Sequence, residues 1–331
     1  MPVDIASGSV ELAFEDVALP GKVTLVWDRR YSTSRVGRAA QPFGSGWANR
    51  YFATLTRRPG GFDFVTPRGG SVSIDDPDGL ADRGRPAANL GAFLEVFWDG
   101  RHYVVQNWDA DSGEVWRYRF DPAPSGEASR LRRIEDVTGQ PLELLWDERG
   151  RLTAVEQRAE RRTLVLTYTP YGLVDRVIVR MVSGEQHLLA RYEYDAAQRL
   201  AAAYDAAENA DRYEYDPDGR LVREIVKDGG VFSYRYDSGG RCIRTSGLDH
   251  YDEKRLRFLD AGGITEVTDS YGSTRLYRRL PSGQLLSEAD PLGGERTTGY
   301  DDQGRIVEQT DATGAVTRYA YDAYGNRTLI V

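Results

Sequence analysis

The stretch Tyr213-Glu-Tyr215-Asp216-Pro-Asp-Gly219-Arg220-Leu221 contains all the signals of one structural unit. Tyrosines two residues apart place both rings on the same face of a β-strand. An aspartate carboxylate accepts nearby backbone N–H groups and starts a turn, and glycine supplies the positive φ that closes it. Arg-Leu then begins the next strand. The stretch therefore predicts the end of one strand, a tight turn and the start of another.

The same pattern recurs through the second half of the chain. The turn positions 198, 219 and 240, and later 283, 304 and 325, are each 21 residues apart. Such internal repeats indicate one supersecondary unit per period. We predict that their Asp, Gly and Arg residues are structural repeat turns and that their tyrosines form a structural aromatic ladder. Outside the first stretch, the turn residues are Asp147, Gly150, Asp195, Asp237, Gly240, Arg241, Asp301, Gly304, Arg305, Asp322 and Gly325, and the ladder residues are Tyr192, Tyr194, Tyr234, Tyr236, Tyr319 and Tyr321.

A second turn signal lies between these turns in several units. Lys227-Asp-Gly-Gly230 is typical of a hairpin, and Asp290–Gly294 and Asp311–Gly314 have the same phase. Each period thus predicts a pair of strands with two turns. About nine such units would stack as hairpins into one long curved antiparallel sheet. Cross-strand aromatic pairs would stabilise it by ~0.5–1 kcal/mol each.

Composition sets the remaining limits. The chain has 331 residues, 40% hydrophobic content and a formal net charge of −8, which argues against nucleic acid as the main partner. Its six tryptophans all precede residue 147, and its lone cysteine, Cys242, excludes an intramolecular disulfide. No apolar run is long enough for a membrane span, and the N-terminus lacks a signal-peptide pattern. We expect an N-terminal β-rich cap domain over 1–75, a β-rich connecting segment over 76–130 and the repeats over 131–331.

The repeats resemble the YD repeats of the Rhs family, which also occur in insecticidal Tc toxins and teneurins. The sequence departs from that consensus at Tyr168-Thr-Pro-Tyr171, where Asp is missing, and at Gln198, where Gly is missing. The first half is similar to the domain that opens Rhs core regions. The segments that carry this second likeness are Pro2–Gly8, Leu19–Ser32 and Phe43–Trp47.

The resemblance implies a function. In that family the repeats spiral into a hollow shell, and many members are bacterial polymorphic toxins delivered by specialised secretion, commonly type VI. The resemblance therefore implies a segment of a toxin shell used in bacterial competition. It would partner with the remainder of an Rhs shell, a second copy, or a toxin or carrier protein. We expect folding in the bacterial cytoplasm and export without a signal peptide.

The search for catalytic chemistry finds no candidate, so we expect no enzyme, no cofactor and no metal. The three histidines are scattered without ligand spacing. The repeated aspartates share one turn position, whereas a catalytic acid would be singular. Asp109–Glu114 is similar to a calcium loop but lacks two of its oxygen ligands. Asp290-Pro-Leu-Gly293 resembles a motif near the family's autoproteolytic site, and its repeat phase favours an ordinary turn.

Two other functions stay open at this point. Tyrosine rings stack on sugars, so the ladder could belong to a carbohydrate- or protein-binding module at a cell surface; packing against neighbouring strands is the simpler role. An unrepeated pair of carboxylates could still make the chain a glycosidase-type enzyme. Glycan-array binding would favour the module, and activity lost with one unrepeated carboxylate would favour the enzyme.

Simple geometry predicts an open sheet. About eighteen strands at roughly 4.8 Å each give a width of ~85 Å, or a closed diameter of only ~27 Å. A toxin domain of about 100 residues is ~34 Å across and would not fit inside. We therefore predict an open shell segment that cannot enclose cargo alone. Its last strand, near Thr328-Leu-Ile-Val331, is apolar and would leave an edge that pairs with another strand.

Overall fold

A computed structural model describes residues 2–38, 42–108, 114–259, 262–322 and 325–331. These residues form β-strands and short 3₁₀ helices, and they include no α-helix. The expected all-β class is confirmed. The chain divides into two compact units. The first unit contains residues 13–30 and 38–209, and the second contains residues 1–12, 31–37 and 210–331.

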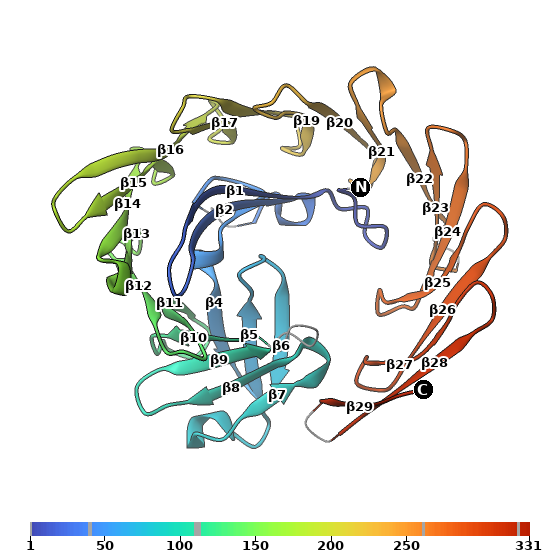
Figure 1. The fold of residues 1–331 in the computed structure, drawn as a ribbon, viewed down its shortest axis with the longest axis horizontal. Helices are drawn as coiled ribbons and strands as arrows, with labels where there is room; N and C mark the ends of the chain where they lie inside the picture. The colour runs from blue at the N-terminus through green and yellow to red at the C-terminus, as the bar shows by residue number, and fades with distance from the viewer. Residues whose placement is uncertain (1, 39–41, 109–113, 260–261, 323–324) are drawn as a thin grey trace. The chain divides into compact units, whose positions relative to one another are not determined.

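The N-terminal region begins with a three-stranded sheet of order β1-β2-β3. Figure 1 labels the first two of these strands, β1 and β2. Two short 3₁₀ helices follow β2 and β3, each capped by a side chain that accepts a backbone N–H. The element bounds are β1 (Glu11–Leu19), β2 (Leu25–Ser32), η1 (Thr33–Arg35), β3 (Trp47–Ala48) and η2 (Arg50–Phe52).

The next strands form a closed ring of paired strands inside the first unit. Strands β4 to β11 follow one another in sheet order, and Ala128–Arg130 of β11 returns to pair with Thr54–Thr56 of β4. The rest of β11 pairs with β10 and β12. This long strand therefore belongs both to the ring of paired strands and to the repeat sheet. The bounds are β4 (Thr54–Arg58), β5 (Gly61–Val65), β6 (Ser71–Asp75), η3 (Ala81–Arg83), β7 (Ala87–Asn89), η4 (Leu90–Ala92), β8 (Leu94–Trp98), β9 (Tyr103–Trp108), β10 (Val115–Phe120) and β11 (Ala128–Asp136).

Antiparallel hairpins build the repeat region of the first unit. Each strand pairs with the one before and after it in sequence, as the repeat pattern predicts. The bounds are β12 (Pro141–Trp146), β13 (Leu152–Gln157), η5 (Arg158–Glu160), β14 (Arg162–Tyr168), β15 (Val174–Met181), β16 (Gln186–Tyr194) and β17 (Leu200–Asp205).

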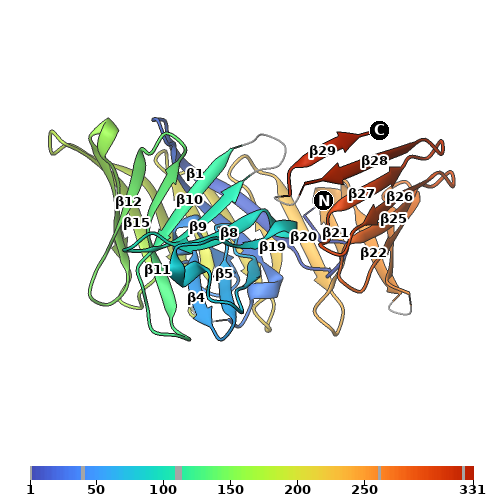
Figure 2. The same cartoon turned by 90° about the horizontal axis from the view of Figure 1, so that it is seen from below.

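The second unit continues the hairpin pattern. Its strands from β20 to β28 follow one another along an arc in Figure 1, and Figure 2 shows β25 to β28 side by side. The bounds are β18 (Ala210–Tyr215), β19 (Leu221–Ile225), β20 (Val231–Tyr236), β21 (Cys242–Gly247), η6 (Leu248–His250), β22 (Lys254–Leu259), β23 (Ile264–Asp269), β24 (Thr274–Arg279), β25 (Leu285–Ala289), β26 (Glu295–Tyr300), β27 (Ile306–Thr310), β28 (Val316–Tyr321) and β29 (Arg327–Ile330).

The sheet of the second unit ends in an open edge. Strand β29 pairs with β28 through Tyr319↔Ile330, Ala320↔Leu329 and Tyr321↔Arg327. Among the described residues of this unit, no strand pairs with the other side of β29. The expected open antiparallel sheet is therefore confirmed.

Every Tyr-Asp hairpin also contains a feature that the sequence analysis did not predict. The register shifts at the second aromatic residue, for example between Glu214 and Tyr215 and between Arg235 and Tyr236. Such a β-bulge bends a strand and increases its twist. Repeated once per period, the bulge bends each successive hairpin in the same way.

The turn glycines are held in the left-handed region, where a side chain costs ~1–2 kcal/mol. Gly219 has φ +83° and Gln198 has φ +61° at the same repeat position. We predict that Gly219→Ala lowers the free energy of unfolding by about 1–2 kcal/mol and that Gln198→Gly raises it by about 1 kcal/mol. Gly299→Ala, in a strand with room for a Cβ atom, is the control and should change little. Urea denaturation measures all three, and equal effects at the first two positions would refute the turn assignment.

Candidate functional site

The repeat turn is closed by a double contact between Asp216 and Arg220. One carboxylate oxygen, Oδ1, accepts the backbone N–H of Arg220 at 2.8 Å, and Oδ2 accepts its side-chain Nε–H at 2.8 Å. The backbone N–H of Gly219 donates to the Asp216 carbonyl at 3.0 Å, and the N–H of Asp216 donates to the Arg220 carbonyl at 2.9 Å. The Asp216 carboxylate accepts hydrogen bonds from both the backbone N–H and the guanidinium of Arg220. It therefore fixes the turn backbone and the arginine side chain together.

The same contact recurs at the predicted turn residues of both units. The arginine Nε to aspartate Oδ2 distances are 2.8 Å at Asp147, 2.7 Å at Asp195, 2.9 Å at Asp237 and 2.8 Å at Asp301. At Asp322 the partner is Asn326, whose amide donates at 2.9 Å. The turn glycines with φ between 78° and 83° are Gly150, Gly219, Gly240, Gly304 and Gly325.

The two sequence departures form the same turn. Gln198 occupies the glycine position and donates its backbone N–H to Asp195 at 3.0 Å. In the hairpin that lacks Asp, the Thr169 hydroxyl accepts the N–H of Leu173 at 3.3 Å. Gly172 closes that turn at φ +84°. The backbone conformation of this turn therefore tolerates substitution of a single consensus residue.

The predicted tyrosines fall into two positions with different roles. The first tyrosine of three pairs is buried: Tyr192, Tyr213 and Tyr234 are 3%, 5% and 2% exposed. The second tyrosine is half-buried, and its hydroxyl donates to a carbonyl of an earlier hairpin in the same unit. These bonds are Tyr194 to Val174 at 2.7 Å, Tyr236 to Leu221 at 2.5 Å and Tyr321 to Ile306 at 2.8 Å.

Two further ladder residues are Tyr215 and Tyr319. The Tyr215 ring lies 6.5 Å from that of Tyr31, and the Tyr319 hydroxyl donates to Gln309 at 2.8 Å. Two tyrosines outside the predicted ladder, Tyr168 and Tyr300, also bond to an earlier carbonyl. Each lies four residues before a turn glycine, Gly172 or Gly304, and this spacing could have identified them in the sequence.

The turn arginine links one repeat to the next. Its guanidinium lies over an aromatic ring of the following hairpin at 5.1 Å for Arg220 and Tyr236, and at 4.7 Å for Arg305 and Tyr321. A cation over a ring face is attracted by ~0.5–1 kcal/mol at exposed sites and more when desolvated. We call the turn aspartate, its arginine and the following ring the repeat clasp.

In the first unit, the N-terminal strands are anchored to the repeats by a buried ion pair. Arg29 is fully buried and donates to Asp16 from Nε at 2.6 Å and from a terminal nitrogen at 2.7 Å. Asp16 also accepts the Tyr192 hydroxyl at 2.7 Å, and that hydroxyl accepts the Trp27 indole N–H at 2.9 Å. The first tyrosine of a repeat thus completes a network that begins in β1 and β2.

In the second unit, the N-terminal residues contact repeat strands through the backbone. The Tyr31 hydroxyl accepts the N–H of Leu221 at 2.8 Å. The Gly8 carbonyl accepts the N–H of Cys242 at 2.8 Å, and the Ile5 carbonyl accepts the Thr265 hydroxyl at 2.8 Å. The N-terminal segment therefore covers the buried face of these repeats.

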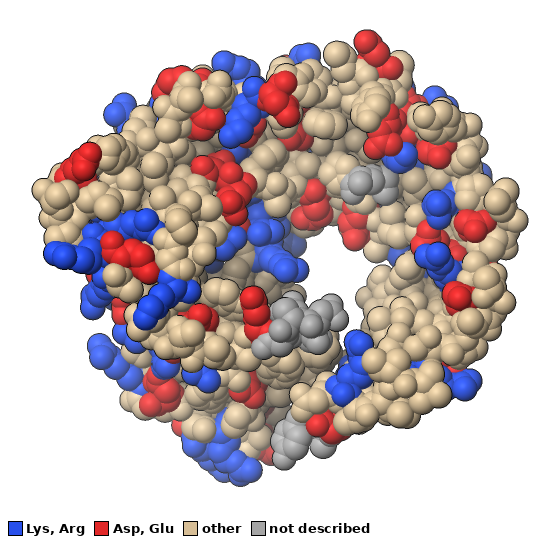
Figure 3. Space-filling model, viewed as in Figure 1, with Lys and Arg blue, Asp and Glu red and all other residues tan. Residues whose placement is uncertain are grey.

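The described residues contain no cluster of histidine, cysteine or carboxylate side chains that could hold a metal ion. Burial raises the pKa of the Cys242 thiol to about 11, which disfavours the thiolate that a nucleophile needs. On the face in Figure 3, basic and acidic side chains are interspersed. The described helices include none that is both long and apolar enough to cross a membrane.

Two sequence motifs remain to be placed. Asp290 accepts the N–H groups of Leu292 and Gly294 at 2.8 and 3.0 Å, which is the turn geometry of Asp311 with Thr313 and Ala315. It lies in an ordinary turn between hairpins. Most of the loop that is similar to a calcium site, residues 109–113, lies outside the described residues.

Comparison with known proteins identifies the repeat region. The family described as Teneurin YD-shell matches residues 132–331, more than half of the chain. The chain belongs to the teneurin YD-shell family. A domain of unknown function, DUF6531, matches residues 1–74 of this YD-shell chain.

Several toxin proteins are similar to this YD-shell chain. Double-stranded DNA deaminase toxin A of Burkholderia cenocepacia (strain H111) is 27% identical over 219 residues, which is 62% of the chain and 14% of that toxin. The solved TcdB2-TccC3 structure without its hypervariable C-terminal region has a TM-score of 0.46 at 12% identity, covering 93% of this chain and 20% of that one. The Photorhabdus luminescens Tc holotoxin pore has a TM-score of 0.33 at 13% identity, covering 82% and 14%. The YD-shell chain thus spans a small part of each.

The clasp predicts a difference between two carboxylates that contact the same arginine. Asp216 also holds the turn backbone, whereas Asp218 is exposed and contacts the guanidinium of Arg220. We predict that Asp216→Ala lowers the free energy of unfolding by about 1–3 kcal/mol, because a backbone donor loses its partner. Asp218→Ala should cost less than about 0.5 kcal/mol. Equal losses in urea denaturation would mean that the turn does not depend on the carboxylate.

The buried hydroxyls predict loss of stability at high pH. Burial raises the pKa of both Tyr234 and Tyr236 above the ordinary value of 10.0. Their contribution is therefore complete below pH 10 and is lost as the pH rises above it, because the unfolded chain releases the proton first. We expect the melting temperature to fall between pH 9 and 11, and to fall less in Tyr236→Phe than in the unsubstituted protein. A variant that loses as much as the unsubstituted protein would contradict this account.

Proposed function

We propose that this chain is a segment of a shell that sequesters a toxin and is delivered between bacteria. The observation that carries the proposal is the open edge of a clasped repeat sheet. In the clasped hairpins one repeat presents the groups that bind the next, and β29 presents a backbone edge without a partner among the described residues of its unit. The family match and the toxin relative support a shell that holds toxic cargo.

The chain's role in this proposal is structural and not enzymatic. Repeated aspartates are occupied in turns, where Asp216 and Asp237 each bond backbone N–H groups and an arginine. The deaminase activity named for the toxin relative belongs to a protein of which this chain matches 14%. We assign the toxic activity to a separate domain that the shell would contain.

The partner at the open edge would be another β-strand. Leu329, Ile330 and Val331 are 50%, 63% and 72% exposed, and apolar edge strands associate readily. The strand could come from more repeats of the same shell, from a second copy or from a carrier protein. In this proposal the shell folds in the bacterial cytoplasm and leaves by a specialised system, such as type VI secretion.

Carbohydrate binding is the alternative function. The buried rings of Tyr192, Tyr213 and Tyr234 favour packing over sugar stacking, since a sugar needs an accessible ring face. Glycan-array binding that Tyr271→Ala abolishes would favour the alternative, because Tyr271 is 93% exposed.

The edge proposal predicts association that one charge would block. We expect the chain to self-associate at high micromolar concentration in sedimentation experiments and Ile330→Lys to remain monomeric, because a lysine on an edge opposes strand pairing. Val182→Lys is the control, since Val182 is also exposed, at 64%, and lies in a turn. A chain that is monomeric at all concentrations, with or without the substitution, would contradict an associating edge.

Delivery between bacteria needs a separate experiment. A producer strain with an in-frame deletion of this chain's coding sequence should no longer inhibit susceptible neighbours in co-culture, and the restored sequence should recover inhibition. A deletion strain that inhibits its neighbours as strongly as the parent would overturn the toxin-shell function.

A further inference from the structure

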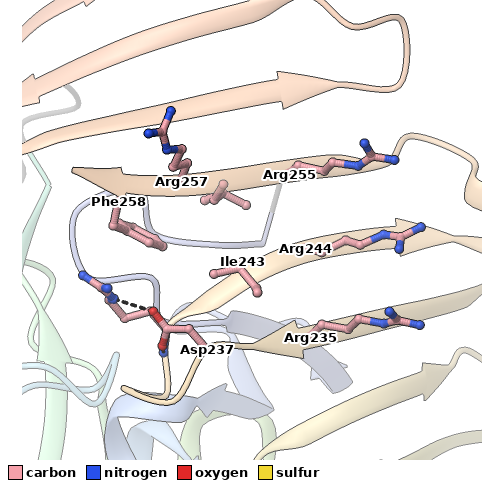
Figure 4. A pocket seen from close by; sticks show the side chains of 9 residues that line it. Arg235, Asp237, Ile243, Arg244, Arg255, Arg257 and Phe258 are labelled. Atoms are coloured by element: carbon pink, nitrogen blue, oxygen red, sulfur yellow. Dashed lines mark hydrogen bonds and ion pairs between the residues drawn. The ribbon is translucent and has the colours of Figure 1, made fainter.

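Three arginines stand in a row on adjacent strands of the second unit. Arg235 of β20 is directly opposite Arg244 of β21, which is opposite Arg255 of β22. Figure 4 shows the three side chains extending in the same direction. At roughly 4.8 Å per strand the row is about 10 Å long. We call these three residues the arginine row.

The row lies on the face opposite the N-terminal segment. Tyr234 and Leu256, which alternate with Arg235 and Arg255 along their strands, are buried, whereas Arg235 and Arg255 are exposed. Like charges directly opposite each other destabilise a sheet. The row therefore costs stability that a neutral or mixed set of side chains would not.

Nearby carboxylates balance only part of this charge. Glu253 pairs with both Arg244 and Arg255 at 2.6 Å. These two contacts hold its pKa low, at about 2, so it stays ionised. The Arg235 side chain has no ion pair or hydrogen bond with any described residue. Glu253 thus pairs with Arg244 and Arg255, and Arg235 is left for another partner.

Two adjacent hollows flank the row and share Arg235 and Arg244. Their volumes are about 460 and about 320 Å³. Apolar side chains lie between the cations: Ile243 and Phe258 line the larger hollow, and Leu248, 61% exposed, lines the smaller. The groove is therefore lined by cations with apolar side chains among them.

We propose that this groove binds an acidic segment of another polypeptide in extended conformation. Alternate residues of an extended chain lie about 7 Å apart on one face, so two carboxylates fit along the row. The planar arginine fork pairs with the carboxylates that this face presents. Asp237, Asp249 and Glu253 lie in or beside the groove and oppose a denser polyanion such as a sulfated polysaccharide. This site is independent of the β29 edge.

A labelled octapeptide of alternating Glu and Leu tests the proposal by fluorescence anisotropy with the full chain. We expect binding that weakens roughly tenfold in Arg235→Glu and also weakens with added salt. Arg180→Glu, which makes the same charge change at another exposed strand arginine, should bind as the unsubstituted chain does. The melting temperature of Arg235→Glu should not fall, since a glutamate opposite Arg244 replaces a like-charge contact.

Three outcomes would overturn the proposal. One is equal binding of the peptide with glutamine in place of glutamate, and another is equal binding by Arg235→Glu and the unsubstituted chain. The third is binding of a heparin oligosaccharide without binding of the peptide, which would assign the groove to sulfated glycans.

Discussion

The structure depends on one contact, the double hydrogen bond between a turn aspartate and the arginine four residues later. At Asp216 the carboxylate fixes the backbone of the turn and the direction of the Arg220 side chain together. That direction places the guanidinium over Tyr236, a ring of the following hairpin. The hydrogen bonds of the turn thereby also produce a contact between neighbouring repeats. A sheet built this way extends by nearest-neighbour contacts, as in other repeat proteins.

The clasp also explains how the N-terminal residues and the repeats fit together. The first tyrosine of a pair is not needed for the clasp, so its hydroxyl is available for other partners. Tyr192 uses it to join Asp16 and Trp27. A buried ion pair such as Asp16–Arg29 is weak evidence for stability, because desolvation offsets much of the attraction. Its clearer consequence is that it positions the Arg29 guanidinium, which lies over the rings of both Phe14 and Trp47.

Sequence alone predicted what is local and repeated. The turn at Asp216–Leu221 follows from residue chemistry, and Gln198 adopts the same turn because period, more than any single residue, sets the fold. The bulge at Tyr215 was not predictable, because a register shift appears only when two strands are paired. The pairing of β11 with β4 was missed for a similar reason. No pattern in Ala128–Arg130 indicates that it pairs with a strand more than 70 residues earlier. The arginine row was missed because Arg235, Arg244 and Arg255 are adjacent only across strands.

The central claim is that the clasp couples one repeat to the next. A double-mutant cycle with Arg220→Met and Tyr236→Leu measures that coupling in the free energy of unfolding. The account predicts an interaction energy of about 0.5–1 kcal/mol between the two positions. Effects that add to within about 0.3 kcal/mol would show that the turn and the following ring act independently, and would contradict the account.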